Sequence, residues 1–159
     1  MRLTAKAEYA LRAGAELAAA AGHPLKGDQV AATQGIPAKF LERILNDLRR
    51  AGIVRSRRGA DGGYWLARDA DQVTLADVIR AVEGPLAEIR GDRPEHVSYS
   101  GAAAALTDVW IALRANERKV LESITLADVA SGDLPAAIVE LTSDPDAWKS
   151  GNQRPSGAA

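Results

Sequence analysis

The side chains best suited to specific chemistry lie in one stretch of the chain, between residues 39 and 50. Lys39 and Arg43 can donate hydrogen bonds to O6 and N7 of guanine, and Glu42 can accept one from the amino group of cytosine. Arg49 and Arg50 follow at the far end of the stretch and suit phosphate oxygens, which fix the register of a protein on DNA. This pattern predicts a surface that contacts the bases and backbone of duplex DNA.

A second basic stretch lies a few residues farther along the chain. Arg57 and Arg58 precede Gly59, and Gly62 and Gly63 follow closely. Glycine has no side chain to keep the backbone away from a phosphate. Arg58 suits a neighbouring minor groove, where a narrow channel concentrates negative potential. We therefore expect Arg57, Arg58 and Gly59 to contact DNA as well.

Charge is divided unevenly along a chain whose net charge is only −1. Residues 1–68 contain 12 Lys and Arg against 6 Asp and Glu, whereas residues 69–159 contain 8 against 15. A basic half joined to an acidic half is typical of a polyanion-binding domain attached to another element. The alternatives are a chance charge gradient and a protein–protein interaction module. Salt dependence separates DNA binding from these two alternatives, because only DNA binding should weaken steeply as the salt concentration rises.

Catalytic and metal chemistry find little support in the residue types. The chain contains no cysteine, which excludes disulfides and thiolate-bound metal sites. His23 and His96 are far apart and offer little for general acid–base catalysis. Neither a phosphate-binding loop with Lys and Ser or Thr nor a metalloprotease helix motif occurs. We therefore expect that the protein is not an enzyme and that it has neither a metal site nor a cofactor.

The elements that must position the basic stretches can be predicted from hydrophobic spacing and caps. Thr4 can cap a helix over 5–21, with Tyr9 on its buried stripe, and a shorter helix follows over 27–33. After a glycine-containing turn, Pro37 opens a third helix at its first position, which continues to about residue 51. Two helices joined by a short turn outline a helix-turn-helix.

The third helix divides into an apolar face and a polar face. Its apolar face comprises Phe40, Leu41, Ile44, Leu45 and Leu48. The segments 53–58 and 64–68 have β-forming character and flank a turn rich in Gly and Asp, so they predict a β-hairpin. A hairpin placed after a helix-turn-helix is a wing. The expected fold is mainly α with a small β-hairpin wing, a winged helix-turn-helix domain plus a long C-terminal dimerisation helix.

The long helix is predicted over 102–122, after a helix over 75–82 and a loop. Two shorter helices should follow, over 124–129 and 134–141. The winged domain is complete before the long helix begins, so its apolar stripe should pair with a second copy in a two-fold homodimer. The alternative is that the helix covers the core of its own subunit. The stripe comprises Leu106, Val109, Trp110, Leu113, Val120 and Leu121.

The chain should therefore divide into four parts. Residues 1–83 form the winged helix-turn-helix domain, 84–101 a loop, 102–142 the dimerisation helix with the C-terminal helices, and 143–159 a flexible tail. No apolar run is long enough to span a bilayer, and the first residues lack the apolar segment of a secretory signal. We expect a cytoplasmic protein with no membrane partner.

Several of these segments resemble the Rrf2 family of bacterial transcriptional regulators. The matching segments are 1–10 (MRLTAKAEYA), 34–37 (QGIP), 48–54 (LRRAGIV), 58–64 (RGADGGY) and 75–84 (LADVIRAVEG). The resemblance covers residues 1 to about 135. It implies a homodimer that binds a two-fold symmetric DNA operator and usually represses nearby genes. By position, it implies DNA contacts from Arg2, Thr4, Tyr9, Pro37, Lys39, Glu42, Arg43 and Arg58.

Many relatives in that family hold an iron–sulfur cluster through three cysteines in the loop before the long helix. Here the loop 84–101 contains none; Glu8 remains from another ligand pattern, but Arg12 occupies the neighbouring turn. The resemblance therefore implies a member without an iron–sulfur cluster. A small-molecule or protein effector, such as a metabolite or a partner enzyme, is the alternative form of control. Its expected region comprises Arg90, His96, Tyr99 and Trp110.

Overall fold

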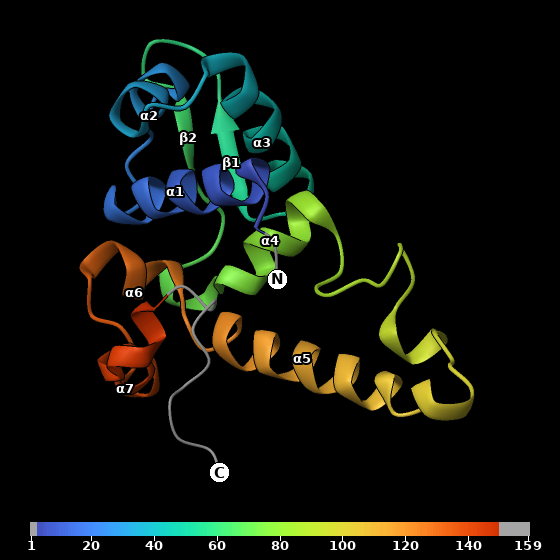
Figure 1. The fold of residues 1–159 in the computed structure, drawn as a ribbon. Helices are drawn as coiled ribbons and strands as arrows, with labels where there is room; N and C mark the ends of the chain where they lie inside the picture. The colour runs from blue at the N-terminus through green and yellow to red at the C-terminus, as the bar shows by residue number, and fades with distance from the viewer. Residues whose placement is uncertain (1–2, 150–159) are drawn as a thin grey trace.

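The computed structural model describes residues 3–149, and its N-terminal half contains three helices (Figure 1). Helix α1 spans Ala5–Ala19, α2 spans Gly27–Gln34 and α3 spans Ala38–Arg50. Thr4 caps α1, because its hydroxyl oxygen accepts a hydrogen bond from the backbone N–H of Ala7 at 3.1 Å. Gly35 ends α2 in the left-handed conformation at φ 62°. Helices α2 and α3 form the expected helix-turn-helix.

Pro37 corrects one detail of the prediction. It precedes α3 as the N-cap residue, whereas the sequence placed it at the first helical position. Its ring fixes φ at −57°, but its ψ of 124° is extended, so the helix begins only at Ala38. The inner face of α3 is buried, as its apolar spacing predicts, through Leu41, Ile44, Leu45 and Leu48.

The predicted wing is a two-stranded antiparallel sheet. Strand β1 spans Val54–Arg57 and β2 spans Gly63–Leu66, and Val54 pairs with Leu66 while Arg57 pairs with Gly63. Leu25 adds an isolated bridge to Tyr64, so the segment before α2 is hydrogen-bonded to the wing. A Cβ at Gly63 would lie 2.5 Å from the carbonyl oxygen of Leu25, and this approach requires glycine. The fold class, mainly α with a β-hairpin wing, is confirmed.

The second half of the chain is helical and returns to the winged domain. Helix α4 spans Leu75–Glu83, α5 spans Leu106–Leu121, α6 spans Leu126–Ser131 and α7 spans Ala136–Ser143. Four short 3₁₀ segments cover Ala70–Gln72, Pro94–His96, Gly101–Ala103 and Pro145–Trp148. Figure 1 shows α5 projecting away from the winged domain, with α6 and α7 beyond its C-terminal end.

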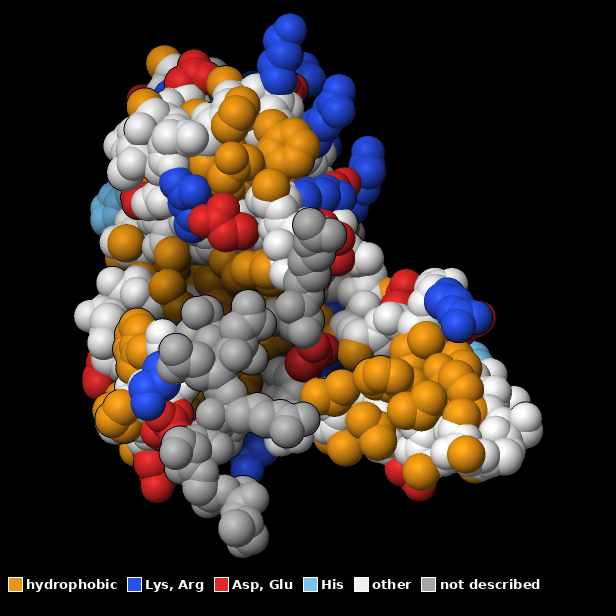
Figure 2. All heavy atoms as spheres, in the orientation of Figure 1, with side chains coloured by type: hydrophobic (Ala, Val, Ile, Leu, Met, Phe, Trp, Pro, Cys, Tyr) orange, Lys and Arg blue, Asp and Glu red, His pale blue; other side chains and the backbone are white. Residues whose placement is uncertain are grey.

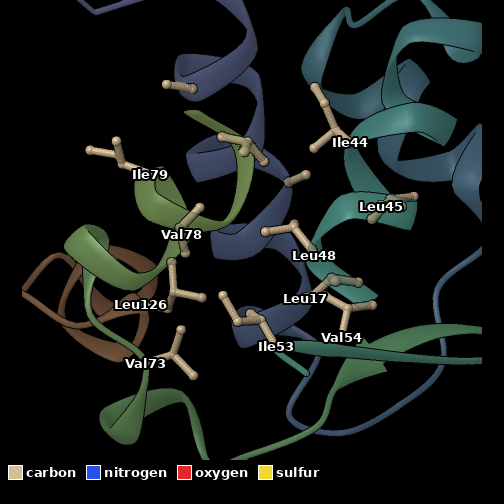
Figure 3. Close-up of a cluster of buried hydrophobic side chains, with 14 of the residues drawn as sticks. Leu17, Ile44, Leu45, Leu48, Ile53, Val54, Val73, Val78, Ile79 and Leu126 are labelled. Carbon is tan, nitrogen blue, oxygen red and sulfur yellow. The ribbon is translucent and has the colours of Figure 1, made fainter. Parts of the chain in front are cut away.

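Helix α6 is packed firmly onto the winged domain. Its Leu126 is fully buried, and a Cβ on Gly14 of α1 would lie 3.1 Å from the Leu126 side chain. The backbone N–H of Leu126 donates to the carbonyl of Val73, and that of Leu75 donates to the carbonyl of Ile124, both at 2.9 Å. Figure 3 shows Leu126 beside Val73 and Val78 within the buried cluster that also includes side chains of α1 and α3. The C-terminal end of α5 is therefore fixed to the winged domain.

Three expectations for the C-terminal part need correction. Helix α5 begins at Leu106, because Gly101–Ala103 forms a 3₁₀ turn instead of its first helical turn. Leu121 is only 9% exposed and belongs to the core of its own subunit, so it is not available to a second copy. Residues 145–148 of the expected flexible tail form a 3₁₀ turn, and Trp148 Nε1 donates to the carbonyl of Thr142 at 2.7 Å. Residues 150–159 of that tail lie outside the described residues.

Among residues 3–149, no helix is long and apolar enough to cross a membrane.

Candidate nucleic-acid interface

The outer face of α3 carries the predicted base-contacting side chains. Lys39, Glu42 and Arg43 are exposed, and so are Arg49 and Arg50 in its last turn. Figure 2 shows Lys and Arg side chains projecting along this side of the molecule. Because the opposite face of α3 is buried in the core, the helix cannot rotate these side chains away from solvent. The structure thus brings the five predicted residues of α3 onto one exposed surface.

The residues on this face differ in their local partners. Within residues 3–149, Lys39, Glu42 and Arg43 make no hydrogen bond or ion pair, so their polar groups are available to a ligand. Arg50 forms an ion pair with Asp47 at 3.3 Å, and Arg49 donates to the side chain of Asn46 at 3.3 Å. The three side chains predicted to contact bases are therefore unpaired among the described residues, whereas the two arginines predicted to bind phosphate are already oriented by neighbours.

Lys6 contacts α3 beside the candidate DNA surface, in a groove that Arg43 and Arg50 also line, and the sequence alone did not reveal this contact. Its ammonium group lies 2.9 Å from Asp47 on α3 and donates to the carbonyl oxygen of Val82, in the last turn of α4, at 2.6 Å. Cations near the C-terminal carbonyls of a helix are favoured by its dipole. Lys6 therefore links α1, α3 and α4 at the edge of the candidate DNA surface.

Thr4 and Tyr9, which the family resemblance implied as DNA contacts, have supporting contacts within the protein. Besides capping α1, the Thr4 hydroxyl donates to the carboxylate of Glu83 at 2.6 Å. The ring of Tyr9 packs edge-on against Phe40 at 5.7 Å, and the guanidinium of Arg12 lies 5.4 Å from its centroid. Their contacts with DNA stay predictions. Arg2 lies outside the described residues.

The tip of the wing is held by hydrogen bonds to its own backbone. Arg57 donates to the carbonyl of Asp61 at 3.1 Å, and Lys26 donates to the carbonyl of Gly59 at 2.7 Å. Arg58 is exposed and makes no hydrogen bond or ion pair within the described part of the chain. The exposed side chain of Arg58 therefore projects from a stretch of backbone that two side-chain hydrogen bonds hold in place. No local pattern in the sequence connects Lys26 to a glycine 33 residues away.

Comparison with known proteins supports the same assignment. The family model for Rrf2, described as an iron-dependent transcriptional regulator, matches residues 3–132. The chain belongs to the Rrf2 family. It is 53% identical over 145 residues to a putative HTH-type transcriptional regulator of Mycobacterium tuberculosis strain H37Rv, which covers 91% of this chain and 90% of the relative. It is 36% identical over 132 residues to the regulator CymR of Bacillus subtilis, which covers 82% and 91%.

Solved structures of this family have the same fold. The structure of CymR, described as the global cysteine regulator of B. subtilis, matches with a TM-score of 0.71 and 34% identity, over 83% of this chain and 98% of that one. The structure of IscR from T. potens matches with a TM-score of 0.67 and 29% identity, over 88% and 96%. The chain is a helix-turn-helix transcriptional regulator of the Rrf2 type.

The iron in the description of the Rrf2 model does not fit the residues of this chain. There is no cysteine anywhere in the sequence. Within residues 3–149, no group of three or more His, Asp or Glu residues could hold a metal ion. Glu8 pairs instead with Arg12 at 3.2 Å, and Glu95 of the loop pairs with Arg114. These two carboxylates form ion pairs within the protein, and the chain lacks the further ligands that an iron site would need.

The loop that precedes α5 is held by side-chain contacts with that helix. Trp110 Nε1 donates to the hydroxyl of Tyr99 at 3.1 Å, and the Thr107 hydroxyl donates to the carbonyl of Val97 at 3.1 Å. A backbone N–H hydrogen bond, followed by the hydrogen bond from Arg114, lowers the pKa of Glu95 below its ordinary value. The loop therefore stays attached to α5 without a metal-centred cross-link.

Among the described residues, one hydrogen bond joins two of the four residues of the predicted effector region. Tyr99 and Trp110 meet, whereas Arg90 and His96 are exposed and make no hydrogen bond to either of them. Arg90 adopts the left-handed conformation at φ 56°, an uncommon state for a residue with a side chain. A groove of about 420 Å³ lies between this loop and α5, and Trp110 and Leu113 form its α5 side.

The predicted dimerisation stripe is largely exposed in one copy of the chain. Leu106 is 36% exposed, Val109 46% and Leu113 50%, and Figure 2 shows the apolar patch over α5. Trp110 and Val120 are half-buried, the first because it packs on the loop. Exposed apolar side chains in a row along a helix are typical of an interaction surface.

Proposed function

We propose that the protein binds a specific DNA operator as a homodimer and represses transcription of nearby genes. Helix α3 enters the major groove, where Lys39 and Arg43 donate to guanine and Glu42 accepts from cytosine. The observation that carries the proposal is the outer face of α3, where these three exposed side chains have no partner within the described residues. Bound at a promoter, the dimer would compete with RNA polymerase for the same DNA.

The wing and the last turn of α3 contribute contacts that do not depend on sequence. Arg49 and Arg50 bind phosphates on one side of the major groove, and Arg57 and Gly59 bind the backbone beside the wing. Arg58 enters the adjacent minor groove. The hydrogen bonds from Lys26 to Gly59 and from Arg57 to Asp61 support this assignment, because a braced tip loses less freedom on binding.

The homodimer follows from the exposed stripe on α5. Leu106, Val109 and Leu113 are too exposed to stabilise one subunit, and a two-fold pair would remove them from water. Two recognition helices would then meet half-sites about one helical turn apart, on the order of 34 Å. The operator should therefore be a palindrome or close to one.

Regulation is proposed to act through the loop 84–101 and the groove beside it. The loop connects α4 of the winged domain to α5, so a ligand or a partner protein bound there can alter the angle between the two. The residues of this region do not fit an iron–sulfur cluster, and a small metabolite or a partner enzyme is the proposed effector. Titrating candidate effectors against operator binding tests this: an effector must change the operator Kd, and a ligand that leaves it unchanged is excluded.

The experiment that tests DNA binding is selection of genomic fragments with the purified full chain, followed by hydroxyl-radical footprinting of the enriched DNA. The expected result is enrichment of a symmetric motif with two protected half-sites one turn apart. The matched control is a variant with Lys39→Ala and Arg43→Ala, which retains the fold because both side chains are exposed and unpaired. Equal enrichment by this variant, or enrichment of no motif, would overturn the proposal.

A further inference from the structure

A basic groove lies at the base of the wing, where α3 ends and β1 begins. Its volume is about 510 Å³, which is within the range of small-molecule sites. None of the described residues that line it is acidic, and five of them carry side-chain N–H or O–H donors. These five are Arg49, Arg55, Ser56, Trp65 and Arg68. A set of donors that includes three guanidinium groups suits an anionic ligand with several oxygen atoms.

The turn after α3 brings residues from the helix and from the wing into this groove. Gly52 adopts the left-handed conformation at φ 72°, and the backbone N–H of Ile53 donates to the carbonyl of Leu48 at 2.9 Å. The chain therefore passes directly from the last turn of α3 into β1. As a result, Arg49 and Arg55 line the same groove from the two sides of the turn.

The hairpin adds an aromatic ring to the groove. Arg55 pairs with Trp65 across the two strands, and side chains directly opposite each other have Cβ atoms about 4.5–5.5 Å apart. The next pair along the strands, Val54 with Leu66, packs on the core, so Arg55 and Trp65 point to the outer face. Trp65 is half-buried, and its indole N–H makes no hydrogen bond within residues 3–149. Both its ring and its N–H are therefore available to a ligand.

The protein itself neutralises little of the positive charge in this groove. Arg55 is exposed and forms no hydrogen bond or ion pair with any described residue. Arg49 donates only to the uncharged side chain of Asn46, at 3.3 Å. Arg68 lies 3.9 Å from the carboxylate of Asp77, which is too far for a hydrogen bond. An anion that enters the groove therefore meets three guanidinium groups that can turn toward it.

We infer that this groove binds a nucleotide with two or more phosphates. The phosphates accept hydrogen bonds from the three arginines, because a guanidinium group can bind a phosphate through two parallel hydrogen bonds. The base stacks on the indole of Trp65, since every base has a π face that an aromatic side chain can cover. Duplex DNA is the competing phosphate ligand, but its bases stay paired inside the helix and would leave Trp65 without a base to stack on.

A nucleotide in the groove should oppose binding of the operator. Arg49 lines the groove and is also proposed to bind an operator phosphate, so a nucleotide that engages Arg49 withdraws it from the DNA. The ligand also places negative charge beside a surface that binds a polyanion. Operator DNA must then weaken nucleotide binding by the same factor. This antagonism rests on the proposed phosphate contact of Arg49, whereas the nucleotide site itself does not.

Isothermal titration calorimetry of the full chain without DNA tests the site directly, with ADP, pyrophosphate and adenosine as separate ligands. ADP should bind most tightly. Pyrophosphate should bind roughly tenfold more weakly, because it lacks the base, and adenosine should not bind detectably, because it lacks the phosphates. Equal affinity for ADP and pyrophosphate would show a site for simple anions and overturn the inference. Absence of ADP binding would overturn it as well.

Variants of the groove separate the phosphate contacts from the base contact. Arg55→Ala should weaken ADP and pyrophosphate alike, by roughly tenfold. Trp65→Ala should reduce the affinity for ADP to that for pyrophosphate and leave pyrophosphate unchanged. Trp65→Phe keeps a ring at this half-buried position and should retain most of the preference for ADP. ADP binding that is unchanged in Arg55→Ala would overturn the inference.

The matched control is Arg57→Ala, which removes the same charge two residues farther along β1. Arg57 donates to the carbonyl of Asp61 and is not among the residues that line the groove, so this variant should bind ADP like the wild type. A loss of ADP affinity equal to that of Arg55→Ala would indicate attraction by net charge alone and would overturn the defined site.

Operator binding in the presence of ADP tests the antagonism. Saturating ADP should raise the operator Kd of the wild type roughly tenfold and leave that of Arg55→Ala unchanged. Without ADP the two proteins should bind the operator equally, because Arg55 is not a proposed DNA contact. An operator Kd that ADP leaves unchanged would overturn the antagonism. Weaker operator binding by Arg55→Ala, with no ADP binding by the wild type, would assign the groove to the DNA surface. Failure to bind any operator would overturn the proposed function but not the calorimetric result.

Discussion

The salt dependence of operator binding tests the role of the wing most sharply. Three arginines in each subunit are proposed to bind the DNA backbone, and Arg58 in the minor groove also displaces counterions, which makes about eight cationic contacts in the dimer. Each neutralised phosphate contributes about −0.9 to the slope of log K against log salt, so the wild-type slope should be about −7. Arg58 makes no bond within the described residues, so Arg58→Ala removes two contacts without disturbing others. The slope should then become shallower by about 1.8.

The measurement is fluorescence anisotropy of a labelled operator fragment between 50 and 200 mM KCl. Over this range the affinity should fall about 10⁴-fold for the wild type and about 10³-fold for Arg58→Ala. The control is Lys149→Ala, which also removes one cation per subunit, but from an ion pair with Asp146 after α7. Its slope should equal that of the wild type, and sedimentation should give the same mass for all three proteins.

A slope for Arg58→Ala that matches the wild type would refute the placement of Arg58 in the minor groove. A wild-type affinity that is independent of salt would refute the electrostatic surface itself, since phosphate contacts cannot form without release of counterions. That second result would favour an interaction module that binds protein.

Three other changes should have separable effects. Arg43→Ala should reduce discrimination at one base pair by about 1–3 kcal/mol, measured by competition with operators mutated at each position. Gly63→Ala should lower the free energy of unfolding by roughly 1–3 kcal/mol in denaturant titrations, because its Cβ would lie 2.5 Å from the carbonyl oxygen of Leu25; an unchanged midpoint would show that the wing yields easily. The hydrogen bond from Arg80 lowers the pKa of Glu122, so its ionised form contributes stability above its ordinary pKa of 4.5 that is lost as the pH falls below it. Glu122→Gln should therefore lower Tm at pH 7 and have a smaller effect at pH 3.5, whereas an equal effect at both would contradict this ion pair.

The α3 surface could be predicted because it depends on local sequence alone. Helical spacing placed Leu41 and Leu48 on one face, and a single helix then requires Lys39 and Arg43 on the other. The wing could also be predicted from local sequence, because two short β-forming segments flank a glycine-rich turn. Only the position of Pro37 differs by one residue: it is the N-cap residue and not the first residue of α3, because its ψ angle is extended.

Contacts between distant segments could not be predicted in this way. The bond from Lys6 to Val82 joins residues 76 positions apart, and no spacing rule relates them. Leu113 and Leu121 belong to the same predicted stripe, yet only Leu113 is exposed. The difference arises where the C-terminal end of α5 meets the winged domain, with Arg80 of α4 paired to Glu122. Periodicity identifies an apolar face, but the packing of other helices decides which part of it is covered.

Helix α5 has a buried C-terminal end and an exposed N-terminal half, and this difference bears on regulation. Its C-terminal end is fixed to the winged domain through Leu75, Ile124 and Leu126, so the angle of α5 determines the position of α3 in each subunit. Its N-terminal half contacts the loop 84–101 and carries Leu106, Val109 and Leu113, the exposed residues of the proposed dimer surface. A ligand that shifts the loop would therefore move the dimer contact and the spacing of the two recognition helices together. Such coupling needs no metal in the loop, because the hydrogen bond between Trp110 and Tyr99 already connects it to the helix.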